Sequence, residues 1–139
     1  MKIELSRQDD AYHMQAVNED GCTVDTDGAE KIGGSNKGMR PMQLLLVGIG
    51  SCSSIDVISI LKKMKQPLED IKITVTAERE ENKAPALFTD IHVHFRMYGE
   101  MDEEKAERAV HLSMEKYCSV TRILEKTANI TWSYELNPS

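Results

Sequence analysis

The sequence predicts an α+β protein whose strands are mostly antiparallel. The first observation behind this prediction is the order of periodic segments, β-β-β-α-β-β-α-α-β, in which strands and helices are grouped. The second is the apolar segment PMQLLLVGIGSCSSIDVISIL, residues 41–61, which predicts a long central helix carrying a cysteine. With 139 residues we expect a single domain with N-terminal strands in 1–27, a Gly-rich loop in 28–40 and the core in the remainder.

The first 40 residues predict short strands followed by a loop. The segments KIEL and AYHMQAV have strand-like composition, and NEDG at 18–21 is a hairpin-turn signal before the strand CTVDT. The segment GAEKIGGSNKGMR is polar and rich in glycine, so it is expected to be irregular.

The central helix is expected to begin at Pro41, since a missing N–H costs nothing in the first turn, and to run to about Lys65. It is nearly apolar all round, so it must be covered on most sides. One sheet covers only one face, so the rest needs another helix, another subunit or both, and we predict a homodimer. Gly48 and Gly50 each cost roughly 1 kcal/mol against alanine inside a helix, so we expect another backbone to approach them closely.

The remaining chain predicts two strands, two helices and a closing strand. Residues 71–80 and 89–99 alternate apolar and polar side chains, as half-buried strands do. Asp102 is expected to cap a helix that runs to about Tyr117, and Ser119 to cap a second, short helix. The segment ITWSYEL closes the chain as a strand.

Composition excludes several functional classes. The net charge is −6 and no Lys/Arg-rich run occurs, so nucleic acid is not an expected partner. The N-terminal MKIELSRQDD lacks the apolar region of a signal peptide, and Gly, Ser and Asp56 interrupt the 41–61 run, so we expect no membrane partner and a cytoplasmic location. In a reducing compartment, three cysteines are not a structural disulfide framework, and any disulfide is expected to be transient and catalytic.

The candidate reactive groups are thiols. Cys52 is either a packed core thiol or a reactive group, and the small residues around it leave room for another molecule to approach the sulfur. Cys118 lies at the junction of two predicted helices, where free N–H groups favour a thiolate. Cys22 is expected to be structural or on the surface. The spacings match no common zinc motif, and His92 and His94, on one strand face, lack a third ligand.

A reactive Cys52 needs a cation from elsewhere in the protein. The helix dipole acts only within the first turn, and Cys52 lies about three turns further on. An apolar environment and the neighbouring Asp56 both disfavour the thiolate form. Spacing alone does not choose among the candidate arginines, which are Arg7, Arg40, Arg79, Arg96, Arg108 and Arg122.

Several segments together resemble the OsmC/Ohr family of thiol-dependent hydroperoxide reductases, and most of all its OsmC-like branch. They are RPMQLLLVGIGSCSSIDVISILKKM, TAERE, APALFTDIHVHF, EKYCSVTRIL and ITWSYEL, and the resemblance extends from about residue 30 to residue 136. It implies an intertwined α+β homodimer with the long cysteine helices at its centre. From the cysteine spacings and the lack of a third ligand beside the two histidines, we expect no metal, and we expect no bound cofactor.

The resemblance also implies a reaction used against oxidative stress. Cys52 matches the peroxidatic cysteine, whose thiolate attacks a peroxide and becomes a sulfenic acid. Cys118 matches the resolving cysteine, which forms a disulfide with Cys52 in the same subunit. An external dithiol, lipoyl-type in the best-known members, restores the thiols. The apolar surroundings favour organic hydroperoxides as substrates.

The chain departs from the family at the helix entrance. Peroxidase members place a Glu there, which works with an Arg from the N-terminal strands to orient and ionise the thiol. Met42 stands at that Glu position, and Gln43 follows it with hydrogen-bonding capacity but no charge. Arg7 and Arg40 are the candidates for the arginine. The predicted catalytic set is therefore Cys52, Cys118, Arg7, Arg40 and Gln43.

Two other hypotheses remain open at this point. The first is a non-catalytic protein that binds a small apolar ligand at the dimer interface with inert thiols, and the loss of the family Glu at Met42 motivates it. The second is a plain structural dimer with two core cysteines.

Overall fold

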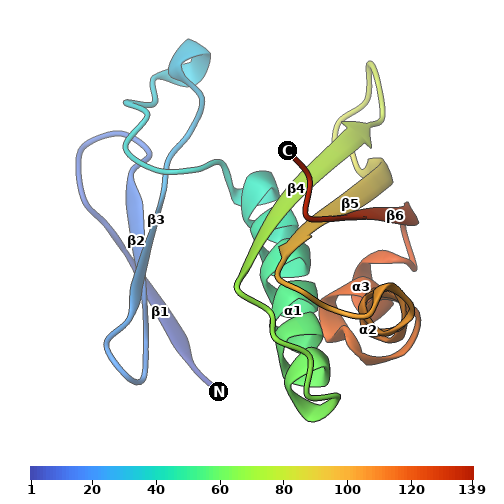
Figure 1. Ribbon diagram of the computed structural model, residues 1–139. Coiled ribbons are helices and arrows are strands. Elements are labelled where there is room, and N and C mark those ends of the chain that lie inside the picture. Colours follow the sequence, from blue (N-terminus) through green and yellow to red (C-terminus); the bar gives the residue numbers. More distant parts are fainter. The chain divides into compact units, whose positions relative to one another are not determined.

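The computed structural model describes all 139 residues, and the chain divides into two compact units, Met1–Leu45 and Leu46–Ser139. Strands and helices follow one another in the predicted order (Figure 1). Each unit contains one three-stranded sheet. The predicted α+β class is therefore confirmed, and so is the mostly antiparallel pairing. That the two units form one domain stays a prediction.

The first unit is a β-meander, in which neighbouring strands pair antiparallel. The turn predicted at residues 18–21 is present: the Asn18 side chain accepts hydrogen bonds from the N–H groups of Asp20 and Cys22, and Gly21 has φ +86°. Positive φ is the reason for glycine at this position. The strands are β1 (Ile3–Arg7), β2 (Met14–Asn18) and β3 (Thr23–Thr26).

The Gly-rich loop is more ordered than its composition predicts. It contains one 3₁₀ turn, η1 (Glu30–Ile32), and it folds around the carboxylate of Asp27, which is 1% exposed. That carboxylate accepts hydrogen bonds from the backbone N–H groups of Lys37, Gly28 and Ser35. The bond from Lys37 is the main reason that the pKa of Asp27 lies below its usual value, although burial opposes the shift.

The central helix, α1 (Pro41–Lys63), ends two residues earlier than predicted, and Lys65 then adopts a left-handed φ of +57°. By length and composition α1 could cross a membrane, but a buried core helix passes the same test. Three of its apolar side chains are fully buried within the second unit: Ile49, Val57 and Leu61.

The second sheet has the order β4-β5-β6 and mixes two pairings. The first pair is antiparallel, whereas β5 and β6 run parallel, a connection that needs the intervening helices. The predicted alternation is confirmed in β5, where Ile91, Val93, Phe95 and Met97 are all fully buried. The strands are β4 (Asp70–Arg79), β5 (Phe88–Tyr98) and β6 (Asn129–Leu136).

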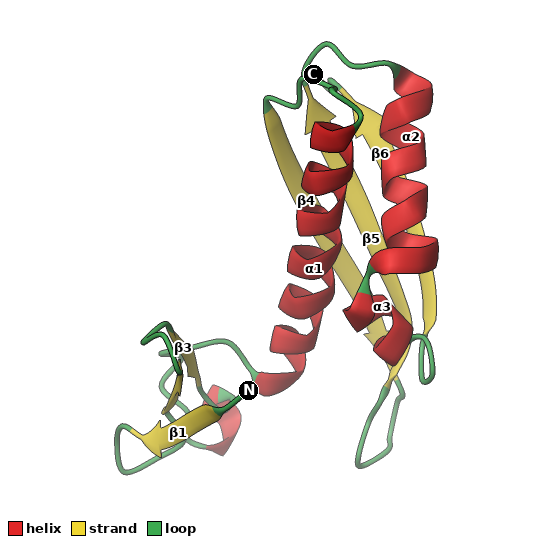
Figure 2. Ribbon diagram, turned by 90° about the horizontal axis from the view of Figure 1, so that it is seen from below, coloured by secondary structure: helices red, strands yellow, loops and turns green.

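The helices of the second unit lie on one face of its sheet (Figure 2). The predicted cap is confirmed, because the Asp102 side chain accepts a hydrogen bond from the Lys105 N–H at 3.1 Å and α2 (Glu103–Leu112) follows. The predicted continuation to Tyr117 is a π-helical turn, η2 (Ser113–Tyr117), rather than α-helix. The last helix is α3 (Ser119–Leu124).

The mid-helix glycines approach side chains rather than another backbone. A Cβ on Gly50 would lie 3.0 Å from Val75 Cγ2 and 3.6 Å from Ile73 Cγ2, both on β4. On Gly48 it would lie 3.7 Å from the Val120 side chain, which is ordinary contact. Gly50 therefore lets α1 pack closely on the sheet, and this brings the following turn of α1 into the unit's interior.

Candidate functional site

The middle of α1 presents a thiol and a carboxylate on one face. Cys52 and Asp56 are four residues apart, so their side chains are neighbours on the helix surface, and both are half-buried. Between them Ser53 is fully buried, and its hydroxyl donates to the Ile49 carbonyl at 2.7 Å. This face of α1 is thus turned into the second unit.

Cys118 lies between the π-helical turn and α3, and it is fully buried. Its N–H donates to the Ser113 carbonyl at 2.8 Å, closing the turn. Its Sγ accepts a hydrogen bond from the Thr121 N–H at 3.4 Å. The predicted Ser119 cap is therefore wrong: Cys118 has the extended backbone of an N-cap, and Ser119 is already the first helical residue.

These side chains from distant parts of the sequence form one cluster. The Sγ atoms of Cys52 and Cys118 and a carboxylate oxygen of Asp56 all lie within 4.8 Å of one another. The buried Ser113 hydroxyl lies 3.2 Å from Asp56 Oδ2 and 3.1 Å from the Ser53 carbonyl, so its single hydrogen is shared between these two acceptors. Two thiols and a carboxylate at this spacing can exchange protons, form a disulfide or bind a metal ion.

The two thiols differ in environment. Burial raises the pKa of Cys118, the hydrogen bonds with Thr121 oppose that rise, and the nearby Cys52 adds to it. Cys118 is therefore a protonated thiol at neutral pH, held inside the protein. Cys52 is the more exposed residue of the pair, being half-buried where Cys118 is buried.

Arg122 fixes the segment that carries Cys118. Its guanidinium donates to the carbonyls of Met114 and Glu115, each at 2.6 Å, and pairs with Glu125 at 3.1 Å. It thus holds the π-helical turn against α3. In the sequence, Arg122 was one of six candidate cations and had no assigned role. Its position, one helical turn after Cys118, is the feature that could have indicated a role in placing that thiol.

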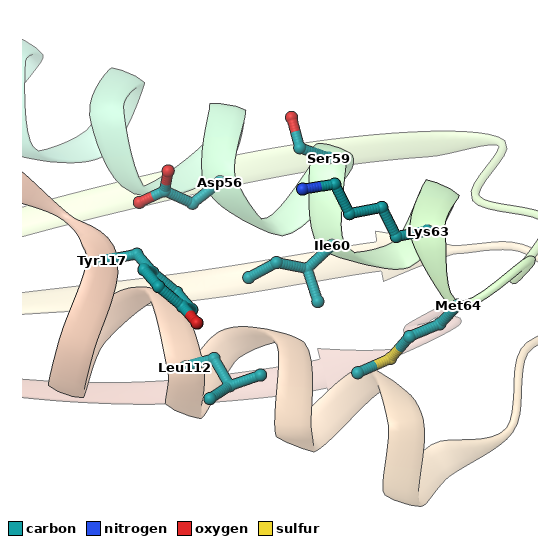
Figure 3. Close-up of a pocket in the computed structure, with 7 residues that line it drawn as sticks. All are labelled: Asp56, Ser59, Ile60, Lys63, Met64, Leu112 and Tyr117. Carbon is teal, nitrogen blue, oxygen red and sulfur yellow. The ribbon is translucent and has the colours of Figure 1, made fainter.

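A pocket of about 530 Å³ adjoins the cluster. Figure 3 shows Asp56 and Tyr117 together at one part of the pocket, with Leu112 and Met64 further along it. Asp56 belongs to both the pocket wall and the thiol cluster, so the pocket borders the cluster at this carboxylate. The lining residues are Asp56, Ser59, Ile60, Lys63, Met64, Leu112 and Tyr117.

Gln43 supports the start of α1. Its Oε1 accepts a hydrogen bond from the backbone N–H of Arg40 at 3.0 Å, which is the arrangement of a capping box in which the third helical residue reaches back to the N-cap. The Arg40 guanidinium donates to the Gly38 carbonyl at 2.9 Å and to Asn36 Oδ1 at 3.0 Å.

The other predicted arginine, Arg7, also has partners within the first unit. Its guanidinium donates to the carbonyls of Asp10 and Ala11 in the loop after β1. In the second unit, Arg79 donates to the Ala86 carbonyl. The roles of Arg7, Arg40 and Gln43 at the thiols stay predictions. Cys22 is exposed, which agrees with its expected place on the surface.

The two histidines with possible metal-binding spacing bind side chains of β6 instead. His92 forms hydrogen bonds with Thr131 and Ser133, and His94 with Ser133 and Glu135. Both rings thus belong to a row of polar side chains across the parallel strand pair β5–β6, which is a structural rather than a metal-binding role.

The chain is similar to known proteins in both sequence and structure. The family model described as "OsmC-like protein" matches residues 34–133. Protein YhfA of Escherichia coli K12 is 48% identical over 102 residues, 73% of this chain and 75% of YhfA. The crystal structure of a hypothetical protein from Aquifex aeolicus VF5 is 35% identical, with a TM-score of 0.79 over 99% of this chain and 97% of that one.

A more distant structure shares the fold alone. The organic hydroperoxide resistance protein OsmC from Legionella pneumophila is 17% identical to this chain, with a TM-score of 0.73. The match covers 96% of this chain and 95% of that protein.

Proposed function

The chain belongs to the OsmC-like protein family, and from this premise we propose that it is a thiol-dependent organic hydroperoxide reductase active in the oxidative stress response. The observation that carries the proposal is the approach of the Cys52 and Cys118 sulfurs to within 4.8 Å inside an α+β unit. The name of the Legionella protein with the same fold, organic hydroperoxide resistance protein, supports the substrate class.

In the first step the Cys52 thiolate attacks one oxygen of the hydroperoxide. The O–O bond breaks, the departing oxygen takes a proton and leaves as an alcohol, and Cys52 becomes a sulfenic acid. The apolar walls of the pocket beside Asp56 suit the organic group of such a substrate. The greater exposure of Cys52 agrees with its attacking role.

In the second step the Cys118 sulfur attacks the Cys52 sulfenic acid. A disulfide forms, water leaves, and the two sulfurs close from within 4.8 Å to about 2.05 Å. The raised pKa of Cys118 keeps it protonated while Cys52 reacts with peroxide, which suits the resolving role. An external dithiol then reduces the disulfide by exchange, so each cycle transfers two electrons to one hydroperoxide.

We propose that Arg7 or Arg40 supplies the cation that favours the Cys52 thiolate, with Gln43 fixing the helix start beside Arg40. The capping bond from Gln43 supports that second role. Replacing each arginine by alanine tests the assignment. The variant that lacks the activating cation should oxidise Cys52 much more slowly. Once Cys52 has become a sulfenic acid, the disulfide should form at the normal rate.

We also propose that the protein is a cytoplasmic homodimer. Beside the buried face of α1, four of its apolar residues are exposed: Leu45, Val47, Ile55 and Ile58 are 42%, 46%, 59% and 43% exposed. A second subunit covering them would remove this apolar surface from water. Light scattering should give twice the chain mass of 15.7 kDa, and a monomer at micromolar concentration would contradict the dimer.

The function is tested by hydroperoxide consumption. The reduced protein, supplied with dihydrolipoamide, should consume cumene hydroperoxide continuously. Cys52→Ser should abolish consumption, and Cys118→Ser should stop it after about one equivalent, because the sulfenic acid forms but is not resolved. Cys22→Ser, which changes an exposed thiol, is the matched control and should keep the full rate. A Cys52→Ser variant with undiminished turnover would refute the proposal.

The pocket also favours a second candidate, a non-catalytic protein that binds a small apolar ligand. Its apolar lining and volume of about 530 Å³ are within the usual range for small-molecule sites. This candidate predicts that mass spectrometry under native conditions detects a co-purified apolar molecule, and that the reduced protein consumes no hydroperoxide.

A further inference from the structure

The thiol cluster has the donor atoms of a metal site. Around a tetrahedral zinc ion with Zn–S near 2.3 Å and Zn–O near 2.1 Å, two sulfurs lie roughly 3.8 Å apart and a sulfur and an oxygen roughly 3.5 Å. The sulfurs of Cys52 and Cys118 and an Asp56 oxygen already lie within 4.8 Å of one another. Adjustments of about 1 Å bring all three onto one ion.

Two buried groups orient these donor atoms. The Ser113 hydroxyl donates to the Asp56 carboxylate at 3.2 Å, and the Thr121 N–H donates to the Cys118 sulfur at 3.4 Å. Ser113 is fully buried and Thr121 is 2% exposed, so water does not replace either donor. Metal ligands in proteins are held by such outer hydrogen bonds, which fix the ligand's direction.

A divalent cation would bind this cluster in exchange for the thiol protons, which metal binding releases. Within residues 46–139, no lysine, arginine or histidine forms an ion pair with Asp56. With both thiols deprotonated, the three ligands carry three negative charges in a largely buried place, and a divalent ion offsets two of them. Thiolate sulfur favours zinc-like ions over Mg²⁺ and Ca²⁺, which prefer oxygen ligands throughout.

We propose that the reduced protein binds one Zn²⁺ ion through Cys52, Cys118 and Asp56. Three protein ligands leave the fourth tetrahedral position open for water or a small anion. Asp56 also lines the 530 Å³ pocket, so the proposed site borders that pocket.

The ion would then be released by oxidation of its ligands, a consequence that rests on the proposed function. An organic hydroperoxide takes one electron from each thiolate and two protons from solvent, giving one disulfide, one alcohol, one water and free Zn²⁺. The two thiolates no longer exist as ligands, and Asp56 alone does not retain the ion. Zinc would therefore protect the reduced thiols, and peroxide would displace it.

The site is tested by titrating the reduced Cys22→Ser protein, kept reduced with a phosphine, with Cd²⁺ and with Zn²⁺. Cd²⁺ should produce an ultraviolet sulfur-to-cadmium absorption that saturates at one equivalent. Zn²⁺ should suppress that absorption, and competition with a chromophoric chelator gives its affinity. Absence of the cadmium absorption at one equivalent would overturn the site.

Variants then identify the ligands. Cys52→Ser and Cys118→Ser should each abolish one-to-one binding. Asp56→Asn should weaken Zn²⁺ binding by at least about tenfold, since loss of an outer partner alone typically costs 10–100-fold. Asp90→Asn, the same change on an exposed strand position, should leave the affinity unaltered. Equal affinities for the Asp56 and Asp90 variants would overturn the assignment of Asp56.

The last measurement separates this inference from the proposed function. Cumene hydroperoxide is added to the zinc-loaded protein, and free zinc and disulfide are measured together. One zinc ion released for each disulfide formed is the expected result. Zinc binding without any disulfide would leave the site standing and refute the reductase, whereas a disulfide without prior zinc binding would refute the site alone.

Discussion

Replacing Cys118 with alanine is expected to destabilise the fold more than replacing it with serine, although both changes remove the proposed resolving thiol. The reason is that the Cys118 sulfur caps α3 by accepting the Thr121 N–H at 3.4 Å. A serine hydroxyl can accept the same hydrogen bond, whereas alanine leaves a buried N–H without a partner.

The magnitude follows from the two groups that change. An unsatisfied buried N–H costs about 1 kcal/mol or more, and Thr121 is only 2% exposed, so water does not relieve it. Removing the buried sulfur loses about 0.8 kcal/mol, the value for a group of methylene size. Cys118→Ala should therefore lower the free energy of unfolding by about 2 kcal/mol. Cys118→Ser keeps the cap but also loses the sulfur, so it should cost about 0.8 kcal/mol.

Urea unfolding of the reduced variants at one fixed protein concentration measures the difference. Hydrogen exchange at the Thr121 amide gives an independent readout, because its protection should fall in the alanine variant and persist in the serine variant. Equal urea midpoints for the two variants, with unchanged protection of the Thr121 amide, would refute the capping role.

Three further outcomes are expected. Gly48→Ala should raise the free energy of unfolding by up to about 1 kcal/mol, because alanine is the better helix former. Gly50→Ala should give no gain, because its methyl group would lie 3.0 Å from Val75 Cγ2. Equal gains in urea midpoint for the two variants would contradict this packing. Asp27→Asn should destabilise the protein at pH 7, because the folded-state pKa of Asp27 lies below its unfolded value. The stability that the Asp27 carboxylate contributes is complete above the unfolded pKa and is lost as pH falls through the folded pKa. The melting temperatures of the parent protein and the variant should therefore converge in acid. Leu112→Gln in the pocket wall should lower kcat/KM for cumene hydroperoxide about tenfold but leave that for hydrogen peroxide unchanged, and equal losses for both would argue against the pocket as the organic-group site.

The sequence predicted the order of elements because most of them carry a clear periodicity. The alternation in β5 corresponds to four fully buried side chains, and Asp102 caps α2 as its position indicated. The direction of β6 was not predictable, because alternation is the same in parallel and antiparallel strands. The fold of the Gly-rich loop around Asp27 depends on N–H groups up to ten residues away, which composition does not show.

The candidate site was predictable in its residue types but not in its contacts. Cys52 and Cys118 stood out as thiols in special contexts, yet only the fold brings their sulfurs together. Asp56 was considered only as a neighbour of Cys52 along the helix, and its link to Ser113 depends on the packing of η2 against α1. The cap at Cys118 was assigned to Ser119 because serine is the commoner capping residue.

The most direct test of the central claim is to identify the disulfide by mass spectrometry. The reduced protein is treated with one equivalent of cumene hydroperoxide, free thiols are alkylated, and the peptides are mapped without reduction. The predicted result is a peptide pair joined through Cys52 and Cys118, with Cys22 alkylated. A peroxide-treated protein in which Cys118 is still fully alkylated while Cys52 is oxidised would contradict the two-cysteine mechanism.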